Sequence, residues 1–228
     1  MFDLKNTPHP IVKASSGKTI KIVAMAETPE LMIMDDIGGD MFGDGIDASE
    51  VKAFLSKHRS TEVVARFNSF GGDAFQGLVM HNAFQEHGNV KAIVDGIAFS
   101  AASTAAMGAK TLVMNEASSF GVHRAWTLAM GNQKEMQAAI EWLDQVDQHM
   151  IAIIQNRTGA KLEQVEAWVD GTDDGTIFSA QEALDAGFAD EIIPLKKQRE
   201  ATSKQASGKA YSRMVAELKQ KSLTARRR

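Results

Sequence analysis

Short apolar runs alternate with amphipathic segments along most of the chain. β-Branched and apolar residues predict strands over 61–67, 89–94 and 110–115. Between them, residues at helical spacing predict a helix over 73–88, and a run of small residues predicts a short helix over 100–109. Strands that alternate with helices favour right-handed βαβ crossovers and a mainly parallel sheet. The fold class expected from this pattern is therefore α/β.

Residues typical of helix ends mark further elements. Asp47 and Glu50 stand three apart and predict a capping box at the start of a helix. Ser179 and Glu182 predict a second box, on a helix that stops at Gly187. The spacing that predicts the helix over 73–88 is that of Phe75, Leu78, Val79, Asn82, Ala83 and Glu86. The remaining predicted elements are strands over 18–26 and 30–39 and helices over 132–156 and 162–169.

Composition narrows the classes of protein that fit this pattern. The chain has 228 residues, 44% of them hydrophobic, which suffices for one α/β domain with a substantial core. It has no cysteine, so disulfides and thiol catalysis are excluded, and any metal site would need His and carboxylate ligands. We expect neither a metal nor a cofactor. The first residues do not resemble a signal peptide, and no apolar stretch reaches the roughly 18 residues of a membrane helix. We therefore expect a soluble, cytoplasmic protein.

Charge is distributed unevenly along the chain. Residues 195–228 contain eleven Lys and Arg residues but two Glu residues, a net charge of +9, which leaves −13 for residues 1–194. The pattern predicts one domain over 1–194, with a partly irregular segment over 1–25, and a basic, partly disordered tail over 195–228. Such a tail is either a solvated surface or a binding segment for an acidic partner or nucleic acid. Its sole aromatic residue is Tyr211, so the aromatic side chains that stack on bases are scarce.

The junctions between strands and helices carry the candidate chemistry. In an α/β sheet, active groups gather where strands end and helices begin. Ser100 stands at such a junction, where it is either a helix N-cap or a nucleophile beside the free amides of a helix start. At another junction, Gly71 and Gly72 allow a close backbone approach, so an amide there can help to hold an oxyanion.

A serine nucleophile needs a base and a group that orients the base. His123 follows the next strand and a turn, a path that returns it to the end of the strand before Ser100. The turn "VDGTDDGTIF" offers Asp170, Asp173 and Asp174, although clusters of Asp and Gly are also typical of plain loops. The other histidines, most of which fit helix faces or helix ends, are His9, His58, His81, His87 and His149. A triad is defined by geometry, so spacing alone leaves both the triad and a structural role for these residues open.

Four segments, in order, resemble the Clp-type serine proteases. "FNSFGGD" resembles the family's "NSPGG" segment, and "GIAFSAAS" is similar to its nucleophile motif "GxAAS". "SSFGVHRAW" resembles the segment of the catalytic histidine, and "RTGAKLEQVEAWV" with "IFSAQEALDAGFADEI" resembles the C-terminal signature. The resemblance spans residues 35–193. It implies that Ser100 is the nucleophile, that His123 is the base, and that Asp174, or alternatively Asp173, is the acid. It also implies that the backbone amides of Gly71, Gly72 and Ala101 hold the oxyanion. Ser103 is then expected to pack or to bond the carbonyl four residues back.

The shorter spacing, the "SAAS" pair and the lead-in "DDIGGDMFGDGI" resemble most the phage prohead or head-maturation branch of that family. The resemblance implies a crotonase-like ββα superhelix and stacked homo-oligomeric rings, which would meet through the helix over 132–156. It also implies ATP-independent, cofactor-free hydrolysis of peptide bonds in scaffold or capsid protein. The implied location is the host cytoplasm or the interior of the procapsid, with no membrane partner.

Two positions depart from the family pattern, and two other functions remain open. Phe70 replaces the usual proline of "NSPGG", and Phe99 replaces the small residue before the nucleophile. A crotonase-like enzyme acting on coenzyme A thioesters shares the fold and the oxyanion amides but needs no Ser-His pair. A non-catalytic capsid assembly protein would keep the fold alone.

Overall fold

The computed structural model describes residues 28–39, 45–171 and 175–196. The chain divides into two units, Met1–Pro194 and Leu195–Arg228, and the elements described below belong to the first. The strand expected over 18–26 and nearly all of the basic tail lie outside the described residues, as do Asp173 and Asp174. Within the described ranges, no helix combines the length and the apolar character that crossing a membrane requires.

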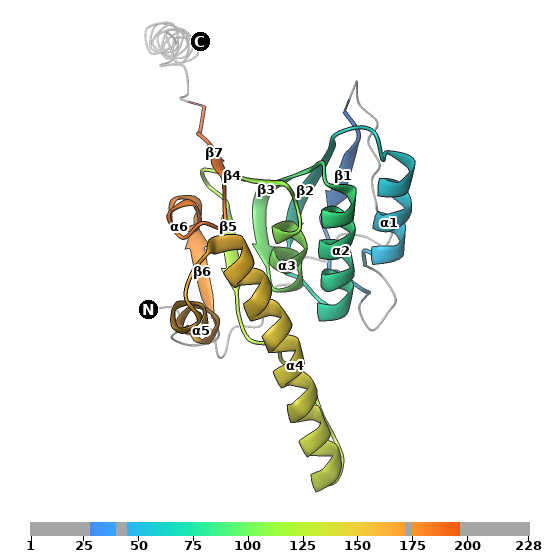
Figure 1. Ribbon diagram of the computed structural model, residues 1–228, viewed down its shortest axis with the longest axis vertical. Helices are drawn as coiled ribbons and strands as arrows, with labels where there is room; N and C mark the ends of the chain where they lie inside the picture. Colours follow the sequence, from blue (N-terminus) through green and yellow to red (C-terminus); the bar gives the residue numbers. More distant parts are fainter. Residues whose placement is uncertain (1–27, 40–44, 172–174, 197–228) are drawn as a thin grey trace, which may run out of the picture. The chain divides into compact units, whose positions relative to one another are not determined.

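Seven strands form one sheet in which parallel pairing dominates (Figure 1). The main path consists, in spatial order, of β1 (Glu30–Ile33), β2 (Val63–Ser69), β3 (Val90–Phe99), β4 (Thr111–Asn115) and β7 (Glu191–Ile193). All four pairings in this path are parallel, which confirms the predicted α/β class. β5 (Ser119–Val122) pairs in parallel with the second half of β3, and β6 (Thr176–Ser179) runs antiparallel to β5.

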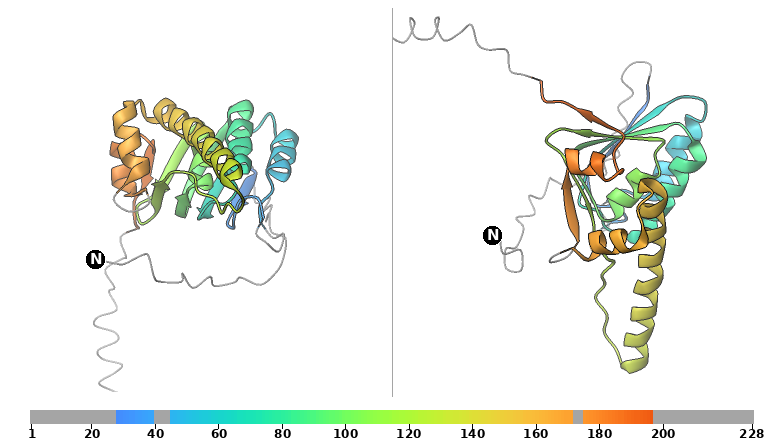
Figure 2. Two further views of the ribbon diagram at one scale, coloured as in Figure 1. Left: turned by 90° about the horizontal axis from the view of Figure 1, so that it is seen from below. Right: turned by 60° about the vertical axis from the view of Figure 1, so that its left-hand side comes forward.

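The helices gather on one side of this sheet (Figure 2). Those of the crossovers are α1 (Ala48–Lys57), α2 (Ala74–His87) and α3 (Ala101–Met107), and those that follow are α4 (Gln133–Thr158), α5 (Leu162–Asp170) and α6 (Ala180–Asp185). α2 and α3 approach closely because Gly77 has no side chain: a Cβ atom there would lie 2.7 Å from the carbonyl oxygen of Ala101. The start of α3 is thereby held against α2.

α4 is only partly packed. Its second half contributes Val146, Met150 and Ile154 to the core, whereas its first half projects past the sheet (Figures 1 and 2). The chain reaches the tip of this projection through residues 124–131. The predicted amphipathic helix is therefore correct. Its first half leaves Ile140 and Trp142 exposed, and Trp142 contacts Phe75 of α2 with ring centroids 5.6 Å apart.

An aromatic cluster holds the small β5–β6 pair in place. Phe120 of β5 and Phe178 of β6 pack against Phe188, with ring centroids 5.1 and 5.0 Å from it. Trp168 of α5 closes the cluster, with its ring 5.3 Å from that of Phe188. Burial of large aromatic side chains is a major source of stability, so this cluster fixes the strand that leads to His123.

One detail of the predicted helices was wrong. The Asp47 side chain caps α1 by accepting a hydrogen bond from the Ser49 amide, and no reciprocal box with Glu50 forms. In α2, which forms as predicted, Ala83 is the one buried residue among those at the predicted helical spacing, whereas Phe75 and Val79 are 44% and 45% exposed. The residues that α2 buries are Gly77, Met80, His81, Ala83 and Phe84. Because α2 has apolar residues on all its faces, their spacing predicts a helix but does not identify the face that packs against the core.

Three short strands were missed at the level of sequence. The segment taken as a turn before His123 contains β5, and β6 and β7 fall in stretches that were assigned to a loop or to no element. Each has only three or four residues, too few for a period to emerge. The consequence is large for β5, because this strand brings His123 to the sheet edge where Ser100 lies.

Candidate active site at the β3–α3 corner

Ser100 occupies a strained corner between β3 and α3. Its backbone angles are φ 58° and ψ −126°, and among the described residues it is the one non-glycine residue with positive φ. Ser100 holds the N-cap position, yet its side chain makes no capping hydrogen bond. By contrast, Asp73 and Ser179 cap their helices through the side chain in the usual way. The capping role does not explain the hydroxyl of Ser100.

Ser103 has a structural role. It is fully buried, and its hydroxyl donates to the carbonyl oxygen of Ser100 at 2.7 Å. The acceptor lies three residues back rather than the expected four. The Thr104 amide donates to the same oxygen at 3.1 Å, so two donors hold the strained carbonyl.

The glycine loop after β2 lies against Ser100. Gly71 has φ 103°, and a Cβ atom there would come within 2.7 Å of the Ser100 Cβ and 2.9 Å of the Ala101 nitrogen. Gly72 instead lies against Ile37, whose carbonyl oxygen would be 2.2 Å from an added Cβ. A glycine at position 71 is thus required for the two backbones to meet.

Three amides were predicted to serve as oxyanion donors. The Ala101 amide belongs to the first turn of α3, where helix amides have no carbonyl partner within the helix. The Gly71 amide donates to the Ser69 hydroxyl at 3.1 Å. No described residue accepts a hydrogen bond from the Gly72 amide. Of the three, Gly71 and Ala101 are adjacent to Ser100.

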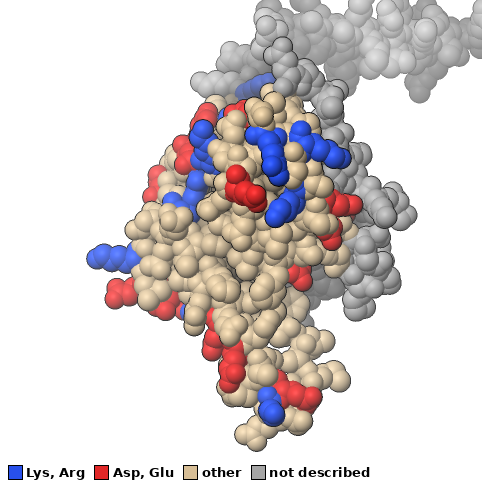
Figure 3. Space-filling view, turned by 45° about the vertical axis from the view of Figure 1, so that its right-hand side comes forward, with Lys and Arg blue, Asp and Glu red and all other residues tan. Residues whose placement is uncertain are grey.

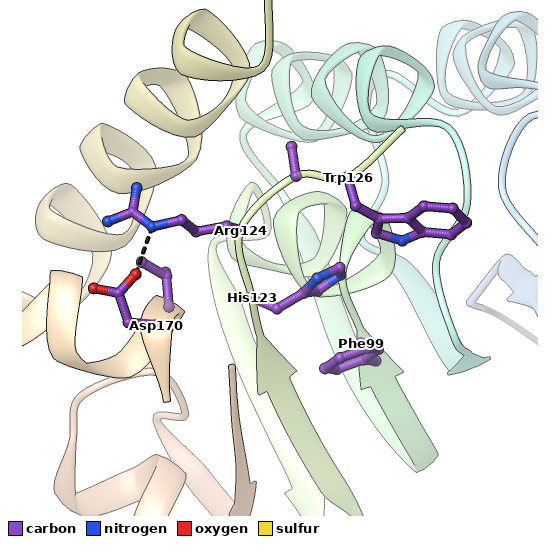
Figure 4. A pocket seen from close by; sticks show the side chains of 7 residues that line it. Phe99, His123, Arg124, Trp126 and Asp170 are labelled. Atoms are coloured by element: carbon purple, nitrogen blue, oxygen red, sulfur yellow. Dashed lines mark hydrogen bonds and ion pairs between the residues drawn. The ribbon is translucent and has the colours of Figure 1, made fainter. Parts of the chain in front are cut away.

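His123 follows β5 directly and lies beside the same corner. Residues Phe99 and Gly121 are register partners, and the Ser100 amide donates to the Gly121 carbonyl at 3.2 Å. The His123 ring stacks on Phe99, with centroids 4.7 Å apart and planes 11° apart (Figure 4). Ser100 and His123 both line a small pocket of about 30 Å³, whose other walls include Leu78, Val146 and Met150. The structure thus brings the predicted nucleophile and the predicted base together.

The other described histidines are elsewhere. His81 is buried in α2, with Nδ1 3.2 Å from Asn82 Oδ1, and burial lowers its pKa. His87 Nε2 lies 3.1 Å from the carbonyl oxygen of His58. His149 is exposed on α4, and His9 lies outside the described residues. His123 is therefore the described histidine that shares a pocket with Ser100.

A charged cluster fixes the segment immediately after His123. Arg124 Nε donates to Asp170 Oδ1 at 2.5 Å and its Nη1 donates to Asp147 Oδ2 at 3.2 Å. Asp147 Oδ1 also accepts from the Ala125 amide at 2.7 Å. The hydrogen bond from Arg124 lowers the pKa of Asp170 and raises that of Arg124. Asp170, one of the three candidate acids, is thus engaged by Arg124.

The other two candidate acids stand in the chain between Gly171 and Gly175, whose positions the structure describes. Asp173 and Asp174 lie outside the described residues, but Gly171 and Gly175 flank them and pair with each other. A Cβ atom on Gly175 would lie 2.4 Å from the Cβ of His123. The chain therefore returns to His123 one residue after Asp174.

Arg124 and Asp147 were missed in the sequence. Asp147 sits on α4 between Leu143 and Met150, at three- and four-residue spacing on the packed side, and it is 7% exposed. Its position in the sequence could have been noticed, because a carboxylate on the buried side of an amphipathic helix requires hydrogen-bond donors from another segment. It finds them in Arg124 and Ala125.

A larger open cleft adjoins the small pocket. It has a volume of about 560 Å³, and His123 lies between Phe99 and the charged cluster in its wall (Figure 4). Its lining residues are Phe99, His123, Arg124, Ala125, Trp126, Val169 and Asp170. His123 and Ala125 line both this cleft and the small pocket at Ser100.

Comparisons with known proteins agree with this architecture. The family model of Clp protease matches residues 25–196, more than half of the chain. The chain belongs to the Clp protease family. Among solved structures, a mutant of ClpP1 from Listeria monocytogenes is similar, with a TM-score of 0.62 and 21% sequence identity over 73% of this chain and 92% of that one. This match shows a ClpP-like fold, and no curated protein sequence matches the chain.

The charged cluster predicts a shift that can be measured residue by residue. In Arg124→Gln, the pKa of Asp170 should rise toward its ordinary value of 3.8, because the guanidinium that stabilises the ionised carboxylate is gone. Carboxyl chemical shifts followed by NMR over pH 2–6 would measure this. Lys52→Gln is the control, since Lys52 pairs with Glu86 at 3.8 Å on another surface. An Asp170 pKa that is the same in the wild type and in Arg124→Gln would contradict the assignment.

The same pair predicts the sign of a pH effect on stability. Because the folded-state pKa of Asp170 is lowered, the stabilisation by Arg124 is present above the ordinary carboxyl pKa and is lost as pH falls through the lowered value. The difference in unfolding free energy between the wild type and Arg124→Gln should therefore shrink in that acid range and stay constant above about pH 5.

Proposed function

We propose that this protein is a serine endopeptidase in which Ser100 is the nucleophile and His123 is the base. The observation that carries the proposal is the backbone of Ser100, a non-glycine residue at φ 58° whose hydroxyl makes no capping bond. Such a conformation costs on the order of 1–3 kcal/mol and clusters at active sites. A sharp strand-to-helix turn presents a serine hydroxyl beyond the sheet, as in the nucleophile elbow of other hydrolases.

The proposed reaction proceeds in two steps. His123 accepts the Ser100 proton as the hydroxyl oxygen attacks a peptide carbonyl carbon, and the amides of Ala101 and Gly71 hold the resulting oxyanion. The Gly71 amide exchanges its bond to Ser69 for one to the oxyanion, or Gly72 supplies the second donor. His123 then gives the proton to the leaving amine, and water hydrolyses the acyl-enzyme. The reaction needs neither ATP nor a cofactor.

Asp174 is the proposed acid, with Asp173 as the alternative. Support comes from Gly175, which lies against His123 directly after Asp174, and from Asp170, which is engaged by Arg124. The carboxylate would fix the tautomer of His123 and stabilise its imidazolium.

The proposed substrates are phage scaffold or capsid proteins, processed during head maturation. Support for this comes from the sequence alone, from the "SAAS" pair and the acidic, glycine-rich lead-in to the domain. The protein would then act in the host cytoplasm or inside the procapsid. The domain over 1–194 would carry catalysis, and the basic tail over 195–228 would bind an acidic partner.

We also propose homo-oligomeric rings that stack through the projecting part of α4. The large apolar residues that are exposed on this part of α4 and on the segment before it are Trp126, Leu128, Met130, Ile140 and Trp142. Leu128 and Met130 are 87% and 88% exposed. Figure 3 shows uncharged side chains over much of the projecting end, with charged ones among them. Large apolar side chains exposed on one part of a protein typically mark a protein–protein interface.

A fluorophosphonate probe tests the nucleophile. The wild type should carry a single adduct on Ser100, located by peptide mass spectrometry, and Ser100→Ala should carry none. His123→Ala should react far more slowly, since loss of the base in such a triad typically lowers kcat by about 10⁶-fold. Ser103→Ala is the matched control in the same helix and should retain the adduct. A folded wild type without an adduct would contradict the proposal and favour a non-catalytic assembly protein.

Three substitutions distinguish the candidate acids. Replacement of the triad carboxylate by Asn should lower the labelling rate of Ser100 by about 10⁴-fold, because an amide favours the wrong imidazole tautomer. We expect this loss for Asp174→Asn and only small changes for Asp173→Asn and Asp170→Asn. A large loss in Asp173→Asn alone would transfer the role to Asp173, and equal small effects would exclude a triad acid in this turn.

Light scattering after size exclusion tests the assembly. The wild type should be a multimer, and Leu128→Asp or Met130→Asp should give a smaller species, because a carboxylate buried in an apolar interface loses its hydration. Gln137→Asp introduces the same charge on the polar side of α4 and should leave the size unchanged. A monomeric wild type would contradict the proposed rings.

A further inference from the structure

Phe99 precedes Ser100 and covers one face of the His123 ring. We propose that Phe99 is a positioning residue for the His123 imidazole, and that Gly121 is a glycine in order to leave room for the Phe99 ring. This inference rests on the proposed function, in which His123 is the base that activates Ser100. It assigns a role to a residue that departs from the family pattern.

The contact between the two rings is close and nearly parallel. Their centroids are 4.7 Å apart and their planes differ by 11°. A planar hydrocarbon ring in this arrangement restricts rotation of the imidazole about its side-chain bonds. It offers no hydrogen-bonding group, so it does not compete for the ring nitrogens. Figure 4 shows the two rings one above the other.

Gly121 complements Phe99 across the parallel pair of strands. The two residues are register partners in the pairing of β3 with β5. A Cβ atom on Gly121 would lie 2.3 Å from Cδ2 and 2.8 Å from Cε2 of Phe99. Real Cβ contacts are never this short, so even a methyl group at position 121 would displace the ring. The space above Gly121 is the space that the Phe99 ring fills.

The backbone beside His123 is held independently. Asp147 accepts the hydrogen bond of the Ala125 amide at 2.7 Å, which fixes the chain two residues beyond His123. With the backbone fixed, the orientation of the imidazole depends on what contacts its ring. A misplacement of about 1 Å at a catalytic group can cost about 10²-fold in rate, so a small rotation of His123 would be measurable.

The first experiment separates a positioning ring from a space-filling side chain. Phe99→Leu keeps an apolar side chain of similar size but has no planar face, whereas Phe99→Tyr keeps the planar ring in the wall of the open cleft. We expect Phe99→Leu to lower the labelling rate of Ser100 by the fluorophosphonate and kcat for a small peptide ester about 10- to 100-fold, with KM within about 2-fold. Phe99→Tyr should stay within about 3-fold of the wild type in both rates. Thermal unfolding of each variant verifies that it is folded.

A second route reaches the same contact from the opposite strand. Gly121→Ala should lower the labelling rate of Ser100 in the wild-type background, because the new methyl group displaces the Phe99 ring. In the Phe99→Ala background, the same substitution should add little, since the ring that it would displace is absent. This non-additivity is the expected signature of two residues that act through one contact.

The outcomes separate this inference from the proposed function. If Phe99→Leu reacts at the wild-type rate, or if the effects of Phe99→Ala and Gly121→Ala multiply, the positioning role is overturned while Ser100 remains the nucleophile. If the folded wild type takes no label on Ser100, the proposed function fails, and the positioning role fails with it.

Discussion

The whole site depends on the way in which one strand changes partners along its length. β3 pairs with β4 through Lys91–Val94 and with β5 through Ile97–Phe99. Because β5 joins the far end of β3, the chain that leaves β4 returns to the corner where β3 turns into α3. The Ser100 amide donates to Gly121 at that point, so the strand that leads to His123 is bonded to the residue that it faces. No other pairing in the described sheet brings a histidine to this corner.

The strain at Ser100 persists because its surroundings leave the backbone little alternative. Its amide bonds across to β5, its carbonyl oxygen accepts from Ser103 and Thr104, and Gly71 occupies the space beside its Cβ. Each of these contacts satisfies a polar group or fills a void, and together they offset the cost of positive φ. The hydroxyl is the part of Ser100 that these contacts leave outside the packing.

The sequence anticipated the regular elements well and the site only in part. Long periodic segments such as α4 and the β-branched run of β2 were predicted because burial imposes a period on them. Ser100, Gly71 and His123 were predicted as site residues because their residue types stand where strands end, and the structure places them at one corner. Asp147 was missed because a buried carboxylate is recognised by its donors, which come from a distant segment. The packed face of α2 was also missed, since it depends on Gly77, whose contact with α3 has no counterpart in a hydrophobic pattern.

The steric complementarity of Phe99 and Gly121 also limits which substitutions this corner can accept during evolution. A side chain larger than hydrogen at position 121 collides with the ring as long as Phe99 is present, and a small residue at position 99 leaves a void as long as Gly121 is present. Either substitution alone worsens the packing at this corner, whereas the two substitutions together replace one complementary pair of side chains by another. Positions 99 and 121, 22 residues apart in the chain, should therefore change together among related proteins.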